Sequence, residues 1–330
     1  MSIIIETKAL LRALNEVTRA VPRVAVKLVG RDDTVTVVAY DGALLVAVEV
    51  PARIVRAMDI GVKPAMVKAA LRSTSGATSR ILWSDPWVDV NGLRMRRDDS
   101  PVPSSVTEAT PLNVDWATLA EAARWVGMAA SVDGRPVLTN LHLDGKHLVA
   151  ADNYRVHRFP LPADIDIMLP ARFVAAARNI APEGVLGIGI GGLVVRSPGA
   201  TVVGAAHTYG PYPDIYSLDW GKGLARSLPV SGIVERLRAT CAISHLPVVT
   251  LAFDPGSVTV SHRSEELEWE HTVLSPGGAS DPVSVSGAYL LDAISFPDED
   301  AWITVNGRLS PVTVLQGQRE AMVMPVRTIS

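Results

Sequence analysis

Few residue patterns in this sequence could carry out chemistry. The seven histidines form no His-Glu-x-x-His pair, and the single cysteine, Cys241, cannot build a cysteine-based zinc site. Neither a nucleophile beside its base nor a pair of catalytic acids stands out. The sequence therefore predicts a protein without enzymatic activity, and it predicts no metal site and no cofactor.

Two local patterns imitate ligand-binding motifs. The segment Gly187–Gly192 matches G-x-G-x-x-G, but a strand-like segment, Leu193–Ser197, follows it where a phosphate site requires a helix N-terminus. We expect a turn in a glycine-rich hairpin. No G-x-x-x-x-G-K-[ST] loop occurs, which argues against nucleotide hydrolysis by a P-loop. The adjacent acids Asp298, Glu299 and Asp300 are expected to be solvated in a turn.

Length and composition describe a folded protein. The chain has 330 residues, 48% apolar and 20% charged, which is enough for two or three domains and excludes general disorder. Charges and prolines interrupt every long apolar run, and the first ten residues carry Glu6 and Lys8. We therefore expect a cytoplasmic protein with no membrane segment. The net charge of −3 argues against a protein that coats nucleic acid on all faces.

The elements that would position any site belong to an internal repeat. Six segments share an aliphatic first residue and an aliphatic sixth residue, and all but one carry alanine at the ninth position. These offsets place the apolar residues on one face of a short amphipathic helix. The segments are Ile5–Leu14, Val62–Leu71, Val114–Ala123, Leu169–Arg178, Leu228–Leu237 and Val285–Ile294.

Each repeat segment stands between strand-like segments. Short aliphatic stretches precede most of the helices, and alternating stretches such as Thr34–Ala39 and Val248–Asp254 follow them. Two Pro-rich connectors, residues 98–112 and 210–224, group the modules in pairs. We predict an α+β protein with three similar domains of two strand-helix-strands modules each, at residues 1–108, 109–225 and 226–330. An α+β protein with helices that are evenly spaced by chance remains an alternative.

Charge is distributed unevenly between helices and the rest of the chain. The six helices with their plausible ends carry eleven basic and six acidic residues, a net charge of +5, so the remainder carries −8. Helices that share one side of a sheet would give a basic face suited to phosphates. Ordinary solvated helix faces are the alternative. No recognition helix, zinc finger or RNP motif occurs, so sequence-specific base reading is not expected.

Several motifs along the chain resemble a known family. They are Arg135–Gly145, Ala151–Val156 with the sequence ADNYRV, Tyr212–Leu218, and the terminal segment Met322–Arg327 with the sequence MVMPVR. Over almost the whole chain the sequence resembles the β sliding clamp of bacterial DNA polymerase III. The resemblance implies a DNA clamp fold in which each chain forms half of a closed head-to-tail ring, with helices lining the hole.

The resemblance also implies a groove between the second and third domains that binds short extended peptides carrying a glutamine and hydrophobic anchors. Flexible methionine side chains suit a surface that accepts several partners. Ordinary core packing is the alternative interpretation of these positions. The matching residues are Leu138, Ala151, Asn153, Tyr154, Arg155, Val156, Pro213, Leu218, Met322, Met324, Pro325, Val326 and Arg327.

The family's DNA-facing positions match Arg23 and Arg172 here. The helix charges add further candidates, and the family's subunit interface matches Ala242 and Ile243. Where the family has Thr-Asp-Gly, this chain has Ala151, Asp152 and Asn153, which changes the polar character of the groove. The additional DNA-facing candidates are Arg19, Lys63, Lys68, Arg72, Arg124, Arg178, Arg236 and Arg238.

We therefore expect a homodimeric sliding clamp that encircles double-stranded DNA without sequence preference and tethers a DNA polymerase and a clamp loader through peptide motifs. Two alternatives remain. The chain could be a regulatory decoy that binds clamp partners or forms mixed rings without encircling DNA, or an enzyme with an unrecognised site on a repeat scaffold.

Overall fold

The computed structural model describes residues 2–103, 108–132, 134–190, 192–205, 210–218, 220, 223–245, 247–296 and 299–327. The chain forms two compact units. The first consists of Met1–Ala120 and Arg172–His207, and the second of Glu121–Ala171 and Thr208–Ser330. Each unit joins strands from two predicted domains, and the predicted middle domain is shared between them. The predicted domain limits at residues 108 and 225 therefore stay predictions.

All six predicted helices are present. Each begins two or three residues after the start of its repeat segment, because in five of the six segments the first aliphatic residue belongs to the preceding strand and is buried there. The alanines at the ninth position are also buried, which lets the helices pack closely against neighbouring elements. The helices are α1 (Thr7–Ala20), α2 (Pro64–Arg72), α3 (Trp116–Val126), α4 (Ala171–Ile180), α5 (Ser231–Ile243) and α6 (Gly287–Ala293).

The first unit contains one long sheet. Its main order is β8-β7-β6-β1-β4-β16-β15-β14-β9, and β3, β2 and β5 continue from the other edge of β4. The strands are β1 (Ser2–Glu6), β2 (Val26–Arg31), β3 (Thr34–Tyr40), β4 (Leu44–Ile54), β5 (Met58–Val62), β6 (Thr78–Ser84), β7 (Trp87–Val90), β8 (Leu93–Arg96), β9 (Ala109–Pro111), β14 (Val185–Gly189), β15 (Gly192–Ser197) and β16 (Ala200–Gly204).

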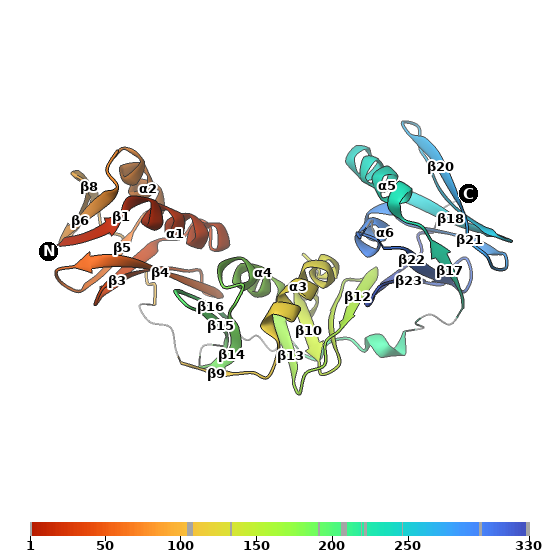
Figure 1. Ribbon diagram of the computed structural model, residues 1–330, viewed down its shortest axis with the longest axis horizontal. Coiled ribbons are helices and arrows are strands. Elements are labelled where there is room, and N and C mark those ends of the chain that lie inside the picture. The colour runs from red at the N-terminus through yellow and green to blue at the C-terminus, as the bar shows by residue number, and fades with distance from the viewer. Residues whose placement is uncertain are drawn as a thin grey trace. The chain divides into compact units, whose positions relative to one another are not determined.

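Strand β4 is the junction of this sheet. Along one edge it pairs with β3, and along the other its first half pairs with β16 and its last residues pair with β1. The glycine-rich motif forms the predicted hairpin, in which β14 and β15 pair from Val185–Arg196 to Gly189–Gly192. In Figure 1, α1 and α4 lie on one side of strands β3, β4, β16 and β15.

The second unit contains an eight-stranded and a four-stranded sheet. Their orders are β13-β10-β11-β12-β24-β23-β22-β17 and β20-β19-β18-β21. The strands are β10 (Asn140–Asp144), β11 (His147–Ala151), β12 (Arg155–Pro160), β13 (Asp166–Pro170), β17 (Leu224–Leu228), β18 (Val248–Asp254), β19 (Ser257–Arg263), β20 (Glu268–Leu274), β21 (Ser280–Ser286), β22 (Ala301–Val305), β23 (Val312–Gln316) and β24 (Arg319–Val323).

Helices α5 and α6 pack against each other and against both sheets of the second unit. Helix α6 contacts β24 and β21, and the indole of Trp269 on β20 donates a 2.8 Å hydrogen bond to the Thr240 hydroxyl of α5. Short 3₁₀ turns, η1 (Gly127–Ala129), η2 (Pro136–Thr139) and η3 (Ile215–Ser217), complete the described elements. Within the described ranges, no helix combines the length and the apolar character needed to cross a membrane.

Of the three adjacent acids near the C-terminus, Asp298 lies outside the described residues. Glu299 pairs with Arg319 at 3.2 Å, and Asp300 is exposed. The pairing with Arg319 is consistent with a surface position for this segment.

A buried arginine ties the two sheets of the second unit together. Arg226 on β17 is only 2% exposed. Its guanidinium donates to the backbone carbonyls of Asp254, Ser257 and Ser275 at 2.9, 2.9 and 2.6 Å. Gly277 passes so close that an added Cβ would lie 2.6 Å from this side chain. One buried cation therefore binds several backbone carbonyl groups in two turns of the four-stranded sheet.

Replacing Arg226 with Met is expected to lower the free energy of unfolding by about 3 kcal/mol, because the carbonyls of Asp254, Ser257 and Ser275 lose a charged donor. Urea unfolding measures the change. The matched control is Arg263→Met, which removes an exposed arginine paired with Glu268 and should have little effect. Equal midpoints for the two variants would contradict the role of Arg226.

Candidate functional site

Four of the predicted groove residues form the floor of one apolar cluster. Ala151 on β11 faces Val156 on β12, which faces Met322 on β24, so the strand register places all three in one row. Leu138 from η2 packs beside them, and all four are at most 6% exposed. Their burial agrees with the alternative interpretation of these positions as core packing.

Two members of this cluster were missed by the sequence prediction. Val149 lies two residues before Ala151 on the same face of β11, and period-two alternation along the strand could have identified it. Ile215, in the turn η3 of the second connector, is 5% exposed and closes the cluster from above. Tyr212 and Trp220 of the same connector pack against it. The connector is therefore part of the candidate site.

Three further apolar groove residues are exposed, and we call them the lip. Tyr154, Leu218 and Met324 are 59%, 38% and 38% exposed. The backbone N–H of Met324 donates to the Tyr154 carbonyl at 2.8 Å, which places the two side chains on adjacent segments. Pro213 and Asn153 are exposed beside them. A buried floor with an exposed apolar lip is an arrangement that can accept apolar side chains of an extended peptide.

The terminal motif reaches this position by crossing between sheets. After β24 the chain forms a bridge from Pro325 to Val285 of β21, and the N–H of Val326 donates to the Ser284 carbonyl at 2.7 Å. Arg327 is exposed. The last three residues, 328–330, lie outside the described residues.

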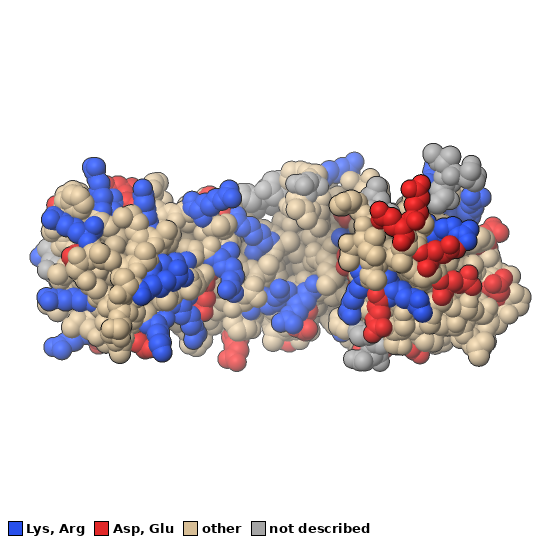
Figure 2. Space-filling model, turned by 90° about the horizontal axis from the view of Figure 1, so that it is seen from above, with Lys and Arg blue, Asp and Glu red and all other residues tan. Residues whose placement is uncertain are grey.

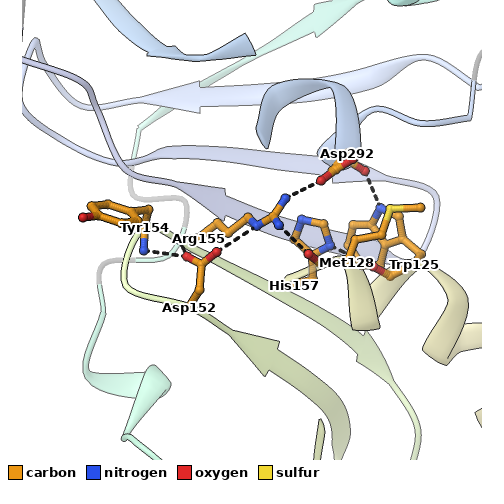
Figure 3. Close-up of polar contacts among 7 residues, drawn as sticks. All are labelled: Trp125, Met128, Asp152, Tyr154, Arg155, His157 and Asp292. Carbon is orange, nitrogen blue, oxygen red and sulfur yellow. Dashed lines mark hydrogen bonds and ion pairs between the residues drawn. The ribbon is translucent and has the colours of Figure 1, made fainter. Parts of the chain in front are cut away.

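Arg155 points into an internal cluster of polar contacts (Figure 3). Its Nε donates to Asp152 at 3.2 Å, Nη1 pairs with Asp292 of α6, and Nη2 donates to the Met128 carbonyl of η1. The guanidinium also lies 4.3 Å from the centre of the Tyr289 ring. These contacts engage all three guanidinium nitrogens of Arg155. They fit a role in fastening α6 and η1 to β12 better than a direct peptide contact.

The basic face expected from the helix charges is clearest in the first unit. Helices α1, α2 and α4 carry seven basic side chains against one acidic side chain, Glu16. Figure 2 shows mainly Lys and Arg over this unit and a mixture of both signs over the second. The seven are Lys8, Arg12, Arg19, Lys68, Arg72, Arg172 and Arg178.

The predicted DNA-facing residues of the first unit differ in exposure. Arg19, Arg23, Lys63 and Arg72 are exposed, and Arg23 has a positive φ of 64°. Lys68 is half-buried and its ammonium lies 2.6 Å from the Thr18 hydroxyl. Burial, with Arg72 nearby, lowers the pKa of Lys68. The exposed four are better placed to meet phosphates than Lys68.

Arg172 lies beside a cavity of about 700 Å³ near the end of α1 and the start of α4. It pairs with Asp41 and donates to the Ala20 carbonyl at 3.2 Å. Burial alone would raise the pKa of Asp41, but hydrogen bonds from the N–H groups of Leu44 and Ala43 and from Arg172 hold it below its usual value. Asp41 therefore stays ionised near neutrality and offsets part of the charge of Arg172.

The helix residues of the second unit are balanced in charge. Helices α5 and α6 and the part of α3 from residue 121 onward carry three basic residues, Arg124, Arg236 and Arg238, against Glu121, Glu235 and Asp292. Arg124 pairs with Glu121 at 3.3 Å, and Arg236 lies 6.0 Å from the centre of the Trp269 ring. Arg178, in the first unit, is half-buried. The excess positive charge predicted for the helices is therefore concentrated in the first unit.

Solved structures with the same fold were found along the whole chain. A DNA polymerase sliding clamp from Caulobacter crescentus matches with a TM-score of 0.83 and 20% identity, covering 99% of this chain and 100% of that one. The sliding clamp from Bacillus subtilis matches with 0.86, 17% identity and 100% of both chains. The DNA polymerase III subunit beta from Pseudomonas aeruginosa matches with 0.84, 19% identity, 99% of this chain and 100% of that one.

The chain has the fold of the bacterial sliding clamps. Neither a protein-family model nor a curated protein matches the sequence. At identities this low the agreement concerns the fold, and it confirms the α+β clamp fold predicted from the repeat and the terminal motifs.

Within this clamp fold the same strand register occurs at two places where strands far apart in the sequence pair. We call these two places seams: β4 pairs with β16 at the first and β12 pairs with β24 at the second. In the first unit Tyr40, Leu45 and Val203 form a row across β3, β4 and β16, as Ala151, Val156 and Met322 do across β11, β12 and β24. The first connector also covers its seam, with Val102 buried against Val38 and Ala47. The internal repeat inferred from the helices therefore extends to the strand pairing.

The two residues predicted at the subunit interface of the clamp fold lie at the end of α5. Ala242 and Ile243 are exposed, the latter by 51%. Helix α5 contacts β20, the last strand of its sheet among the described residues. Their placement beside a sheet edge leaves them accessible to another chain, and the interface itself stays a prediction.

A buried histidine, His157, lies two residues after Arg155 on β12 of the second unit. The His157 ring stacks on Trp125 with centroids 4.3 Å apart, and Nδ1 lies 3.0 Å from the Trp125 carbonyl (Figure 3). Burial lowers the pKa of His157 from 6.5 to about 3, opposed by the hydrogen bond to Trp125. Burial also raises the pKa of Asp292, although Arg155 opposes the shift. This histidine stays neutral in the folded protein.

Because the folded pKa of His157 is depressed, the unfolded chain binds a proton that the folded chain excludes between about pH 6.5 and 3. The stability that the neutral ring contributes is present above pH 6.5 and is lost as the pH falls through this window. At pH 5 the loss should be about 2 kcal/mol. Asp292, with its raised pKa, acts in the opposite direction.

Urea unfolding between pH 7.5 and 5 tests this. The wild type should lose more stability than His157→Phe, which keeps an aromatic ring on Trp125 but cannot titrate. The control is His245→Asn at an exposed position, which should follow the wild type. Parallel pH profiles for wild type and His157→Phe would show that this ring does not set the acid sensitivity.

Proposed function

We propose that the chain is a DNA sliding clamp, a processivity factor without catalytic residues. Two subunits close head to tail into a ring around duplex DNA in the cytoplasm. The ring binds no particular sequence, and it tethers a DNA polymerase and a clamp loader through short peptides. The observation that carries the proposal is the agreement of the whole chain with solved bacterial clamps at TM-scores of 0.83 to 0.86.

The charge distribution supports a nonspecific contact with phosphates. Basic side chains are concentrated on the helices of the first unit, and four of the predicted residues there, Arg19, Arg23, Lys63 and Arg72, are exposed. Contacts of this kind attract the DNA backbone without reading bases, and they weaken as salt rises. A closed ring retains DNA because the duplex passes through its hole, so it needs no stronger electrostatic binding.

Two sheet edges support ring closure. Among the described residues, β8 ends the long sheet of the first unit and β20 ends the four-stranded sheet of the second. An unpaired edge is a template for pairing with another chain. Strand β8 carries Arg94 and Arg96, whereas β20 carries Glu268 and Glu270. Opposite charges favour a head-to-tail contact between β8 of one copy and β20 of another, and such a contact closes a ring when its rotation permits.

Reversing the charge of one edge should weaken the dimer. We expect Arg94→Glu with Arg96→Glu to raise the dissociation constant at least ten-fold in sedimentation equilibrium, with a smaller effect at high salt. Adding Glu268→Arg and Glu270→Arg should restore assembly. Arg80→Glu, an exposed change on β6, serves as the control. Wild-type affinity in the double variant would exclude this pair of edges.

Retention on DNA tests the proposed function directly. Subunits are dissociated, mixed with a nicked circular plasmid and allowed to reassociate, and the complex is then separated from free protein by gel filtration at moderate salt. We expect the protein to remain on circular DNA and to be released when a nuclease linearises the plasmid.

The basic helix face can be tested in the same assay. Arg19→Glu with Arg23→Glu should reduce capture on every DNA sequence alike, and Arg31→Glu on strand β2 is the matched control. Equal retention on circular and linear DNA would mean ordinary electrostatic binding and would contradict the clamp.

A regulatory decoy is the second candidate function. One observation favours it, since the helix residues of the second unit carry as many acidic as basic side chains. A decoy would bind the same peptides or form mixed rings, and it would show no retention on circular DNA. The retention experiment therefore separates the two functions.

A further inference from the structure

The second connector lies on the eight-stranded sheet as a ladder of aromatic contacts. Three of its residues, Tyr212, Tyr216 and Trp220, are spaced four apart, and each contacts a different strand of the same sheet. Tyr212 lies against His142 of β10, with ring centroids 4.8 Å apart. Tyr216 lies against His147 of β11 at 6.0 Å, and Arg158 of β12 lies 3.8 Å from the centre of the Trp220 ring.

The partners of the ladder share the face that carries the groove floor. The strand register aligns His142 with Val149 and Val149 with Arg158, and Val149 is a member of the floor cluster. Arg158 is oriented by Glu320 of β24, which accepts from its Nε at 2.7 Å. The connector is thus held on the sheet by side chains that lie beside the floor.

Within this ladder, the Tyr216 hydroxyl makes hydrogen bonds to two residues of the sheet. Its hydroxyl donates to a carboxylate oxygen of Asp144, and Nδ1 of His147 lies 2.8 Å from the same hydroxyl. Since the hydroxyl has only one hydrogen, Nδ1 of His147 must be the donor to the tyrosine oxygen. Asp144 is fixed in turn by the N–H groups of Lys146 and His147, at 2.8 and 2.7 Å.

The connector between these fastenings carries one side of the groove. Asp214 caps the turn η3 by accepting from the N–H groups of Tyr216 and Ser217, and the Trp220 indole donates to the Ile215 carbonyl at 2.8 Å. Ile215 is the buried cluster residue, and Leu218 follows it on the exposed lip. Tyr216 is therefore linked through the turn η3 to the residues that border the candidate groove.

The other seam provides an internal comparison. By register, Val38, Ala47 and Thr201 occupy the places of Val149, Arg158 and Glu320. With these small residues the first seam keeps a hollow of about 490 Å³, and its connector is fastened by a 3.0 Å hydrogen bond from Lys27 to the Val102 carbonyl. The repeat does not require an aromatic ladder, so the ladder is a special feature of the seam with the candidate groove.

We propose that the second connector is an adjustable wall of the peptide groove and that Tyr216, fastened by Asp144 and His147 outside the groove, is a positioning residue that sets peptide affinity. The inference rests on the proposed peptide groove. It adds that the wall is held by Asp144 and His147, which are not members of the buried apolar cluster.

The test compares Tyr216→Phe with Tyr40→Phe in the full-length protein. Tyr216→Phe keeps the ring and removes both hydrogen bonds of the hydroxyl. Tyr40→Phe removes one hydroxyl contact, to the Gly42 carbonyl at 2.9 Å, at the corresponding seam. Two quantities are measured: amide hydrogen exchange in residues 212–218, and the affinity for a fluorescent peptide with one glutamine and hydrophobic anchors.

We expect Tyr216→Phe to raise exchange in this segment and to weaken peptide binding by about three- to ten-fold, while the urea midpoint stays close to that of the wild type. Tyr40→Phe should change neither exchange nor affinity. Unchanged exchange in Tyr216→Phe would show that Tyr216 does not hold the connector in place. Raised exchange with unchanged peptide affinity would show that the connector does not form a wall of the groove.

Met324→Ala distinguishes these outcomes from a failure of the groove itself. This variant should lose peptide affinity without a change of exchange in the connector, because its side chain lies on the lip. If Met324→Ala and the wild type bind the peptide equally, or if the wild type does not bind it, the proposed groove is wrong. The exchange data then still decide whether Tyr216 fastens the connector.

Discussion

Backbone pairing between strands far apart in the sequence is the constraint on which this structure depends. At each seam an early strand, β4 or β12, pairs with the last strand of a later segment, β16 or β24. Antiparallel pairing fixes the register, and a shift of one residue would turn every side chain to the other face. The row Ala151, Val156 and Met322 therefore exists only while β12 and β24 stay in register.

Charged side chains in this chain have two different roles. Some are internal fastenings, such as Arg226 with its carbonyl partners and Arg155 between Asp152 and Asp292. Others, such as Arg19 and Arg23, are exposed and available to a ligand. A count of basic residues cannot separate these classes, because it records neither burial nor partners. The charge balance within each unit is therefore more informative than the net charge of the chain.

Much of the fold could be predicted from the sequence, because each helix repeats one apolar pattern and the strands alternate. The helix starts were placed two or three residues early, since the aliphatic residues at Ile5 and Val62 are strand residues. Four of the predicted groove residues lie in one buried apolar cluster, and their role in a groove stays a prediction. Arg155 was assigned to the groove from its match to the family's motif, and its contact with Asp292 could not be predicted, because the two residues lie 137 positions apart and no local pattern reports such a contact. Ile215 was missed for the same reason.

Electron microscopy of the purified protein tests the central claim most directly, because a ring is visible without any partner. The account predicts closed particles with two-fold symmetry and a central hole wide enough for duplex DNA, with a mass of two 35.1 kDa chains. Dimeric particles without a hole, or single chains at concentrations where replication proteins work, would contradict it.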